Sequence, residues 1–171
     1  MKKIEEKNGL FAGEVTDKQA IRLLKDAVKS SKLAKYPNIP DYAVTVPHYE
    51  DSTANGLSKC IIDFLNSQDH CYCGRISNEG VMRTNQYGKS FRVKSSMQNG
   101  IFDLDAVIYG RAVKIEIKIG NDKMSQAQHD YKRQIENALG YCLIVKNLQE
   151  FMDWFFENMA KVKAKKGGQN A

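Results

Sequence analysis

The chain has 171 residues, of which 42% are hydrophobic and 9% aromatic, and this is enough to build the buried core of one domain. The longest wholly apolar run, residues 141–145, is too short to cross a membrane. Residues 1–7 lack the apolar stretch that follows the positive charges of a secretory signal. We therefore expect a cytoplasmic protein without membrane spans.

The net charge is +6, from 26 Lys and Arg against 20 Asp and Glu. Residues 75–99 and residues 159–171 each carry +4, so the rest of the chain carries −2. Basic patches of this kind are typical of nucleic-acid-binding proteins, although they also occur on ordinary basic surfaces. The body of the protein is thus nearly neutral, with two basic segments.

Four cysteines are present, two of them in the run His70-Cys71-Tyr72-Cys73. This spacing lacks the second pair of ligands that a zinc site needs. We interpret the cysteines as buried free thiols.

The first half of the chain contains two helical patterns. Apolar residues recur at helical spacing over 17–35, with Thr16 or Asp17 as N-cap, and the segment 36–47 then indicates a break and an extended linker. A second helix is predicted over 54–67, capped by Ser52, Thr53 or Asn55. The domain boundary is expected between residues 36 and 52.

The second half alternates strands and helices. We predict strands at 71–77, 101–109, 112–119 and 141–145, a turn at 77–80, and a long basic loop at 82–99. One helix begins after Ser125 and ends before Gly140 as its C′ glycine, and another follows an Asn147 cap. The expected organisation is an N-terminal helical extension and linker (1–51), a domain (52–160) and a basic disordered tail (161–171).

The strands at 101–109 and 112–119 carry an unusual concentration of charge. If Gly110-Arg111 form a two-residue turn, Asp105 lies opposite Glu116 and Asp103 opposite Lys118. Like charges so close destabilise a sheet unless a cation or a lysine compensates them. Oxygen ligands suit Mg²⁺ or Mn²⁺. The alternative is a solvent-exposed strand face that Lys118 neutralises.

Three short motifs occur in order: Gly100-Ile101-Phe102-Asp103, Glu116-Ile117-Lys118, and Ser125-Gln126-Ala127-Gln128 at a helix start. Together they resemble the PD-(D/E)XK nuclease superfamily over residues 55–155, in particular its VRR-NUC and Holliday-junction-resolvase-like group of small phage and mobile-element proteins. The resemblance implies a restriction-endonuclease-like αβββαβ core of the α/β class. In it, helices flank a central mixed sheet, here with an N-terminal helical extension and a C-terminal helix.

The resemblance also implies roles for individual residues. Asp103, Glu116 and the backbone carbonyl of Ile117 would bind Mg²⁺ or Mn²⁺, and Lys118 would orient or activate the attacking water. Gln128 would be the glutamine beside the site, although Ser125 and Gln128 also form a capping-box pattern. Two departures are Phe102 in place of the usual proline and the lack of an acid on the first helix. Asn55 stands near that helix position, and Asp105 is the candidate for the missing carboxylate.

The leading hypothesis is a metal-dependent nuclease that hydrolyses DNA, with junctions or flaps as candidate substrates and RNA as an alternative. Enzymes of this kind that make two symmetric cuts act as homodimers, so a dimer is a further expectation from the resemblance. A catalytically inactive DNA-binding module is the second hypothesis. An interaction protein that docks through helix 17–35 is the third.

The predicted loop 82–99 would approach the DNA backbone. Its basic side chains suit phosphate contacts, and Tyr87 or Phe91 could stack on an unpaired base. The alternative is a loop whose charges face water. The four basic residues are Arg83, Lys89, Arg92 and Lys94.

Overall fold

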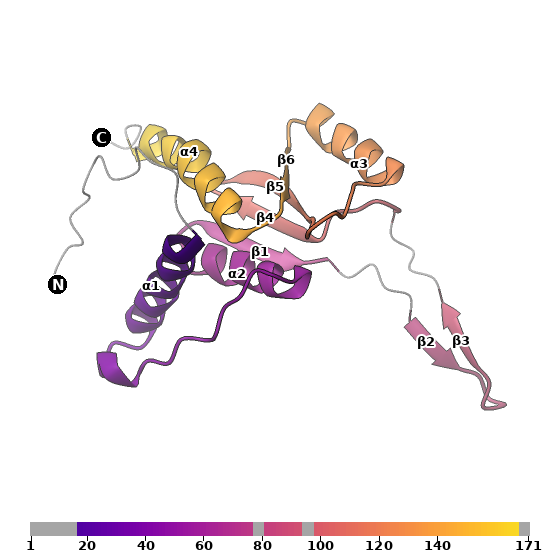
Figure 1. Ribbon diagram of the computed structural model, residues 1–171, viewed down its shortest axis with the longest axis horizontal. Coiled ribbons are helices and arrows are strands. Elements are labelled where there is room, and N and C mark those ends of the chain that lie inside the picture. The colour runs from indigo at the N-terminus through magenta and orange to yellow at the C-terminus, as the bar shows by residue number, and fades with distance from the viewer. Residues whose placement is uncertain (1–16, 77–80, 94–97, 168–171) are drawn as a thin grey trace.

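The computed structural model describes residues 17–76, 81–93 and 98–167 (Figure 1). The fold is mixed α/β. Its helices are α1 (Asp17–Lys35), the short 3₁₀ helix η1 (Asp41–Ala43), α2 (Ala54–Asn66), α3 (Gln126–Asn137) and α4 (Leu148–Gly167). Its strands are β1 (Cys71–Arg75), β2 (Val81–Thr84), β3 (Ser90–Val93), β4 (Leu104–Ile108), β5 (Arg111–Ile117) and β6 (Tyr141–Val145).

The central sheet has the strand order β1-β4-β5-β6. Strands β1, β4 and β5 are antiparallel neighbours, and β6 lies parallel to β5, as its crossover through α3 allows. With the β2–β3 hairpin set aside, the order from α2 onward is helix, three strands, helix, strand. This agrees with the mixed sheet predicted from the sequence.

The register between β4 and β5 differs from the prediction. Asp105 lies opposite Lys114, not Glu116, because the two turn residues are Tyr109 and Gly110. Both have positive φ, 50° and 81°, as the hairpin turn that matches strand twist requires. The shift is two residues, so every side chain keeps its predicted face. One position beyond the last pair, Asp103 comes level with Glu116.

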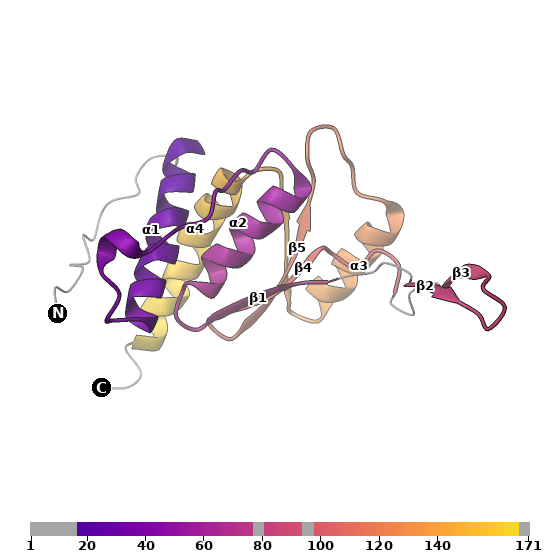
Figure 2. The ribbon, with the colours of Figure 1, turned by 90° about the horizontal axis from the view of Figure 1, so that it is seen from below.

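The two faces of the sheet have different partners. The apolar side chains of β5, Val113, Ile115 and Ile117, are buried in one cluster with residues of α1, α2 and α4. Figure 2 shows these three helices together on one side of the sheet and α3 on the other. The charged alternate residues of β5 therefore face α3, where Gln128 of α3 contacts Glu116.

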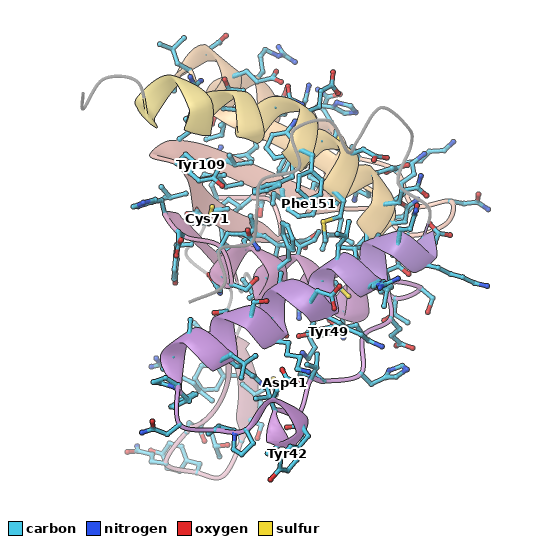
Figure 3. The ribbon with its side chains drawn as sticks, turned by 90° about the vertical axis from the view of Figure 1, so that its left-hand side faces the viewer. Asp41, Tyr42, Tyr49, Cys71, Tyr109 and Phe151 are labelled. Atoms are coloured by element: carbon cyan, nitrogen blue, oxygen red, sulfur yellow. The ribbon has the colours of Figure 1, made fainter. Side chains whose placement is uncertain are left out.

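Aromatic rings hold the helical layer together. Phe64 of α2 makes edge-to-face contacts with Phe151 and Phe155 of α4, with ring centroids 6.0 and 5.1 Å apart. Figure 3 shows Phe151 lying between α4 and α1. Ala20, Leu24 and Val28, spaced four residues apart on α1, complete the layer. The apolar side of α1 thus packs in the chain's own core. The hypothesis of an interaction protein had placed a partner against this helix.

The linker between α1 and α2 also packs. Tyr49 is buried, and its hydroxyl donates to Asp63 Oδ2 at 2.8 Å. Asp51 Oδ2 accepts from the Leu148 amide at the start of α4, also at 2.8 Å. Among the predicted caps of α2, the residue used is Thr53, whose hydroxyl accepts from the Gly56 amide. Segment 36–53 is therefore attached to the body at several points.

Three further predictions need correction. The predicted loop 82–99 contains the β2–β3 hairpin. Helix α4 continues to Gly167, so residues 161–167 are helical where disorder was expected. The left-handed residue after α3 is Leu139, with φ of 62°, in the position expected for Gly140. The predicted cap Thr16 and the turn at 77–80 lie outside the described residues.

No helix in the described ranges is both long and apolar enough to cross a lipid bilayer.

Candidate active site

Glu116 and Lys118 are buried charged residues at the end of β5, only 2% and 6% exposed. They point to the α3 side of the sheet, and Lys118 Nζ lies 2.9 Å from Glu116 Oε1. Burying an ion pair costs solvation free energy that hydrophobic residues of similar size would not cost. The pair therefore calls for an explanation beyond stability.

The two carboxylate oxygens of Glu116 have different environments. Oε1 accepts from both Lys118 Nζ and Gln128 Nε2. Oε2 is buried and has no hydrogen-bond partner among the described residues. Burial raises the pKa of Glu116; the hydrogen bond from Lys118 opposes this rise and the nearby Asp103 charge adds to it. Oε2 is thus the atom at which a proton or a cation would relieve the buried charge.

Asp103 lies just before β4, which begins at Leu104 and not at the predicted residue 101. Its Oδ2 accepts from the Ile117 amide at 2.9 Å, where a longer β4 would have continued the backbone ladder. The Lys118 amide donates to the backbone carbonyl of Val145 in β6. The backbone N–H and C=O groups of successive residues in a strand point to the neighbouring strands on opposite sides. The backbone of Ile117 therefore faces Asp103.

Lys118 is held between two acids. Besides Glu116, Asp122 contacts it, with Oδ2 at 3.3 Å from Nζ. Burial alone would lower the pKa of Lys118, but the hydrogen bonds and charges of Glu116 and Asp122 outweigh it and the pKa is raised. Glu116 and Asp122 therefore favour the positively charged ammonium form of Lys118.

Gln128 serves both of the roles that the sequence left open. Ser125 and Gln128 form a capping box at the start of α3: the Ser125 hydroxyl accepts from the Gln128 amide, and Gln128 Oε1 accepts from the Ser125 amide at 2.8 Å. The Nε2 group of the same side chain donates to Glu116 Oε1. The cap therefore fixes the amide that orients Glu116.

Gln128→Glu is expected to destabilise the protein by about 1–3 kcal/mol at pH 8. A glutamate can still close the capping box, but it places a second carboxylate beside buried Glu116 instead of a donor. Urea denaturation measures the loss. The matched control is Gln126→Glu, in the same first turn of α3 but exposed, where the native amide also donates to a carboxylate, that of Asp130. Equal stability of the two variants would show that Gln128 only caps the helix.

Gly100 brings α3 close to the chain that leads into Asp103. It has φ of +83°, and a Cβ at this position would lie 2.3 Å from the backbone carbonyl of Ala127. The residue can therefore only be glycine if the first turn of α3 is to keep its place.

Gly100→Ala is expected to lower the free energy of unfolding by about 1–3 kcal/mol more than Gly88→Ala. Gly88 also has positive φ, +76°, but a Cβ added there would meet no atom within 4 Å beyond its chain neighbours. Both variants therefore share the backbone strain, and only Gly100→Ala has the clash. Denaturation midpoints in urea give the difference. Equal losses would contradict the close packing of α3 on Gly100.

The structure does not bring Asp105 and Asn55 to Glu116. Asp105 forms an ion pair with Lys114, Oδ1 to Nζ 2.6 Å, as the corrected register requires. Asn55, in the first turn of α2, accepts a hydrogen bond from Arg75 Nη2 at 2.8 Å. Within the described ranges, no group of three or more His, Cys, Asp or Glu side chains is arranged to hold a metal. Of the carboxylates predicted as metal ligands, those of Asp103 and Glu116 lie together at the site.

The residues predicted to contact nucleic acid lie in or beside the β2–β3 hairpin. Arg83 is exposed on β2, Lys89 precedes β3, and Arg92 lies in β3 opposite Met82. Lys94 lies outside the described residues.

The partners of two predicted site residues, Lys118 and Asn55, were missed by the sequence analysis. Asp122 holds Lys118, and Arg75 binds both Asn55 and Ser58. Asp122 follows Lys118 by four residues in a Gly-Asn-Asp turn, and this short spacing was the only signal available. Nothing in the sequence indicated the pairing of Arg75 with α2.

The sequence matches no protein-family model, and no curated protein is significantly similar to it.

Proposed function

We propose that this protein is a metal-dependent nuclease of the PD-(D/E)XK type that hydrolyses phosphodiester bonds in DNA. The observation that carries the proposal is the buried Glu116 carboxylate, whose Oε2 is unpaired among the described residues while Oε1 contacts the Lys118 ammonium. A buried carboxylate oxygen without a hydrogen-bond partner lowers the stability of the folded state, so its presence indicates a ligand. A cation would pair with this oxygen, and the neighbouring Lys118 ammonium would attract an anionic substrate.

The residues present fit a divalent cation. Asp103, Glu116 and the backbone carbonyl of Ile117 would hold Mg²⁺ or Mn²⁺, since Mg²⁺ is commonly bound by one or two protein carboxylates together with substrate phosphate and water. When bound, the ion would lower the pKa of water and neutralise charge on the phosphate. Asp103 Oδ2 accepts from the Ile117 amide, so the remaining lone pairs of this carboxylate, foremost those of Oδ1, would be available to the ion.

The remaining groups act on charge and orientation. The Lys118 ammonium would stabilise the negative charge that develops on the phosphate and hold the attacking water by donating a hydrogen bond. Asp122 and Glu116 fix Lys118 on two sides, and Gln128 fixes Glu116. Such groups are in place before the substrate binds, so little reorganisation is needed during the reaction.

The arrangement of elements supports the same proposal. Glu116 and Lys118 lie at the end of the third core strand, Asp103 lies at the start of the second, and α3 begins beside them. This is the placement that the resemblance to PD-(D/E)XK nucleases implies for the acid, the E-x-K motif and the following helix. Comparison of cleavage rates on junctions, flaps and linear DNA would show which of these substrates the protein prefers.

A second candidate function is a DNA-binding module without catalysis. The observation in its favour is that the first core helix supplies Asn55, occupied with Arg75, instead of an acid. Such a module would bind DNA in a salt-dependent way without cutting it.

Incubation with plasmid DNA, synthetic junctions, flaps and RNA, in Mg²⁺ or Mn²⁺, separates the two candidates. Metal-dependent cleavage of a nucleic acid supports the nuclease. Salt-dependent binding with no product from any substrate contradicts the nuclease and supports the module.

A further inference from the structure

The β2–β3 hairpin stands apart from the rest of the protein. Figures 1 and 2 show it projecting beyond the sheet, away from α1, α2 and α4. It exposes large apolar side chains: Met82 is 63% exposed, Tyr87 82% and Phe91 47%. An isolated two-stranded hairpin is only marginally stable in water. Because Tyr87 and Phe91 are exposed, they do not pack in the hydrophobic core, and their rings are available to a ligand.

The charge of the hairpin selects the kind of ligand. Residues 81–93 include three basic residues, Arg83, Lys89 and Arg92, and no acid. Arg83 lies directly opposite Phe91 in the register, so the two side chains share one face with Cβ atoms about 5 Å apart. A cation beside an exposed ring matches a phosphate beside a base.

The tip of the hairpin is built to present Tyr87. The Asn85 side chain accepts from the amides of Tyr87 and Lys89, at 3.0 and 2.9 Å. Gly88 supplies the positive φ, +76°, that the turn needs. Below the tip, the Thr84 and Ser90 hydroxyls are hydrogen-bonded across the strands at 3.1 Å. An ordered turn holds the exposed ring at small entropic cost on binding.

We propose that the β2–β3 hairpin binds single-stranded nucleic acid, with Tyr87 and Phe91 stacking on unpaired bases and Arg83 and Lys89 contacting phosphates. The inference rests on the proposed function in taking nucleic acid as the ligand. Unpaired bases are required because neighbouring base pairs cover the base faces inside a duplex. A lipid surface fits less well, since the polar tip residues Asn85 and Gln86 would lose water on insertion.

The test is equilibrium binding of the full chain to a fluorescent oligothymidine and to a duplex of the same length, in EDTA so that cleavage does not intervene. Wild type is expected to bind the single strand, and Tyr87→Ala and Phe91→Ala each to weaken that binding about 5- to 100-fold. Binding to the duplex should change much less. Lys89→Ala should lower the slope of log affinity against log salt by about 0.7.

Matched controls are available elsewhere on the surface. Tyr42 is 90% exposed and, in Figure 3, points away from the body at η1, so Tyr42→Ala removes an equally exposed ring far along the fold. Lys25→Ala removes an exposed lysine of α1. Both variants are expected to bind as wild type does.

Wild-type affinity in the Tyr87→Ala and Phe91→Ala variants would overturn the proposal. So would equal weakening on single strand and duplex, or binding to anionic phosphatidylserine vesicles that depends on the two rings while oligothymidine does not bind. The nuclease assignment is read separately, from cleavage with Mg²⁺ or Mn²⁺. If the protein cuts DNA but the hairpin substitutions do not change its affinity for single strands, the nuclease function is supported and binding by the hairpin is contradicted.

Discussion

Glu116→Gln is expected to reduce metal-dependent cleavage by about a thousandfold or more. Glutamine keeps the shape of the side chain and an oxygen that can accept from Lys118 and Gln128. It removes the charge and replaces the unpaired Oε2 with an amide nitrogen, which cannot bind a cation. The buried packing is thus preserved while the proposed ligand is lost. Lys118→Met should have a loss of similar size, because a flexible apolar chain fills the site without the ammonium.

Cleavage of plasmid and branched DNA, with circular dichroism to confirm folding, measures both effects. The controls are Glu136→Gln and Lys132→Met, which remove an acid and a lysine that form an ion pair of the same length, 2.9 Å, on the surface of α3. They are expected to stay within about threefold of wild type, as surface pairs contribute little. Undiminished cleavage by folded Glu116→Gln and Lys118→Met would place the reaction elsewhere.

Mg²⁺ or Mn²⁺ is expected to stabilise the protein more at pH 8 than at pH 5. A ligand at a hundred times its Kd adds about 2.7 kcal/mol. For a chain of this size that corresponds to a rise in Tm of about 5–10 °C. The proposed cation would bind the ionised carboxylate, and burial raises the pKa of Glu116. Protons therefore compete with the metal at acidic pH.

Without metal, the pH dependence has the opposite sign. Because the pKa of Glu116 is raised in the folded state, the native protein binds this proton more tightly than the unfolded chain does. The free energy of unfolding should fall as pH rises from the usual pKa of a glutamate through the raised pKa of Glu116. The raised pKa of Lys118 matters only in alkaline solution, above its usual value.

Thermal denaturation at pH 5 and pH 8, with EDTA or Mn²⁺, measures both trends. Glu116→Gln should lose the metal effect and flatten the pH dependence that belongs to Glu116, while Glu136→Gln should retain both. An equal rise in Tm with Mn²⁺ in wild type and Glu116→Gln would show that the cation binds elsewhere.

Local pattern was enough to predict several elements closely. Apolar spacing gave α1 its observed bounds of 17–35 and β6 its bounds of 141–145. Strict alternation along β5 placed Lys114, Glu116 and Lys118 on one face, and a two-residue error in register left that result intact. Hydrophobic periodicity is a property of the chain itself, so it can be read without knowing what each element packs against.

The partners of the charged residues depended on the tertiary structure. The positive φ of Tyr109, a non-glycine residue, set the β4–β5 register. In this register Asp105 forms an ion pair with Lys114. The close approach of α3 to Gly100 places Gln128 beside Glu116. Because β4 begins only at Leu104, the Ile117 amide donates to the Asp103 side chain instead of to a backbone carbonyl. The sequence by itself determined that Glu116 and Lys118 share the charged face of one strand. Only the fold decided that, among the described residues, Glu116 keeps one oxygen unpaired. Lys118 is near in sequence, but Gln128 reaches the same oxygen, Oε1, from α3, and packing buries Oε2 where no donor in the described part of the chain reaches it.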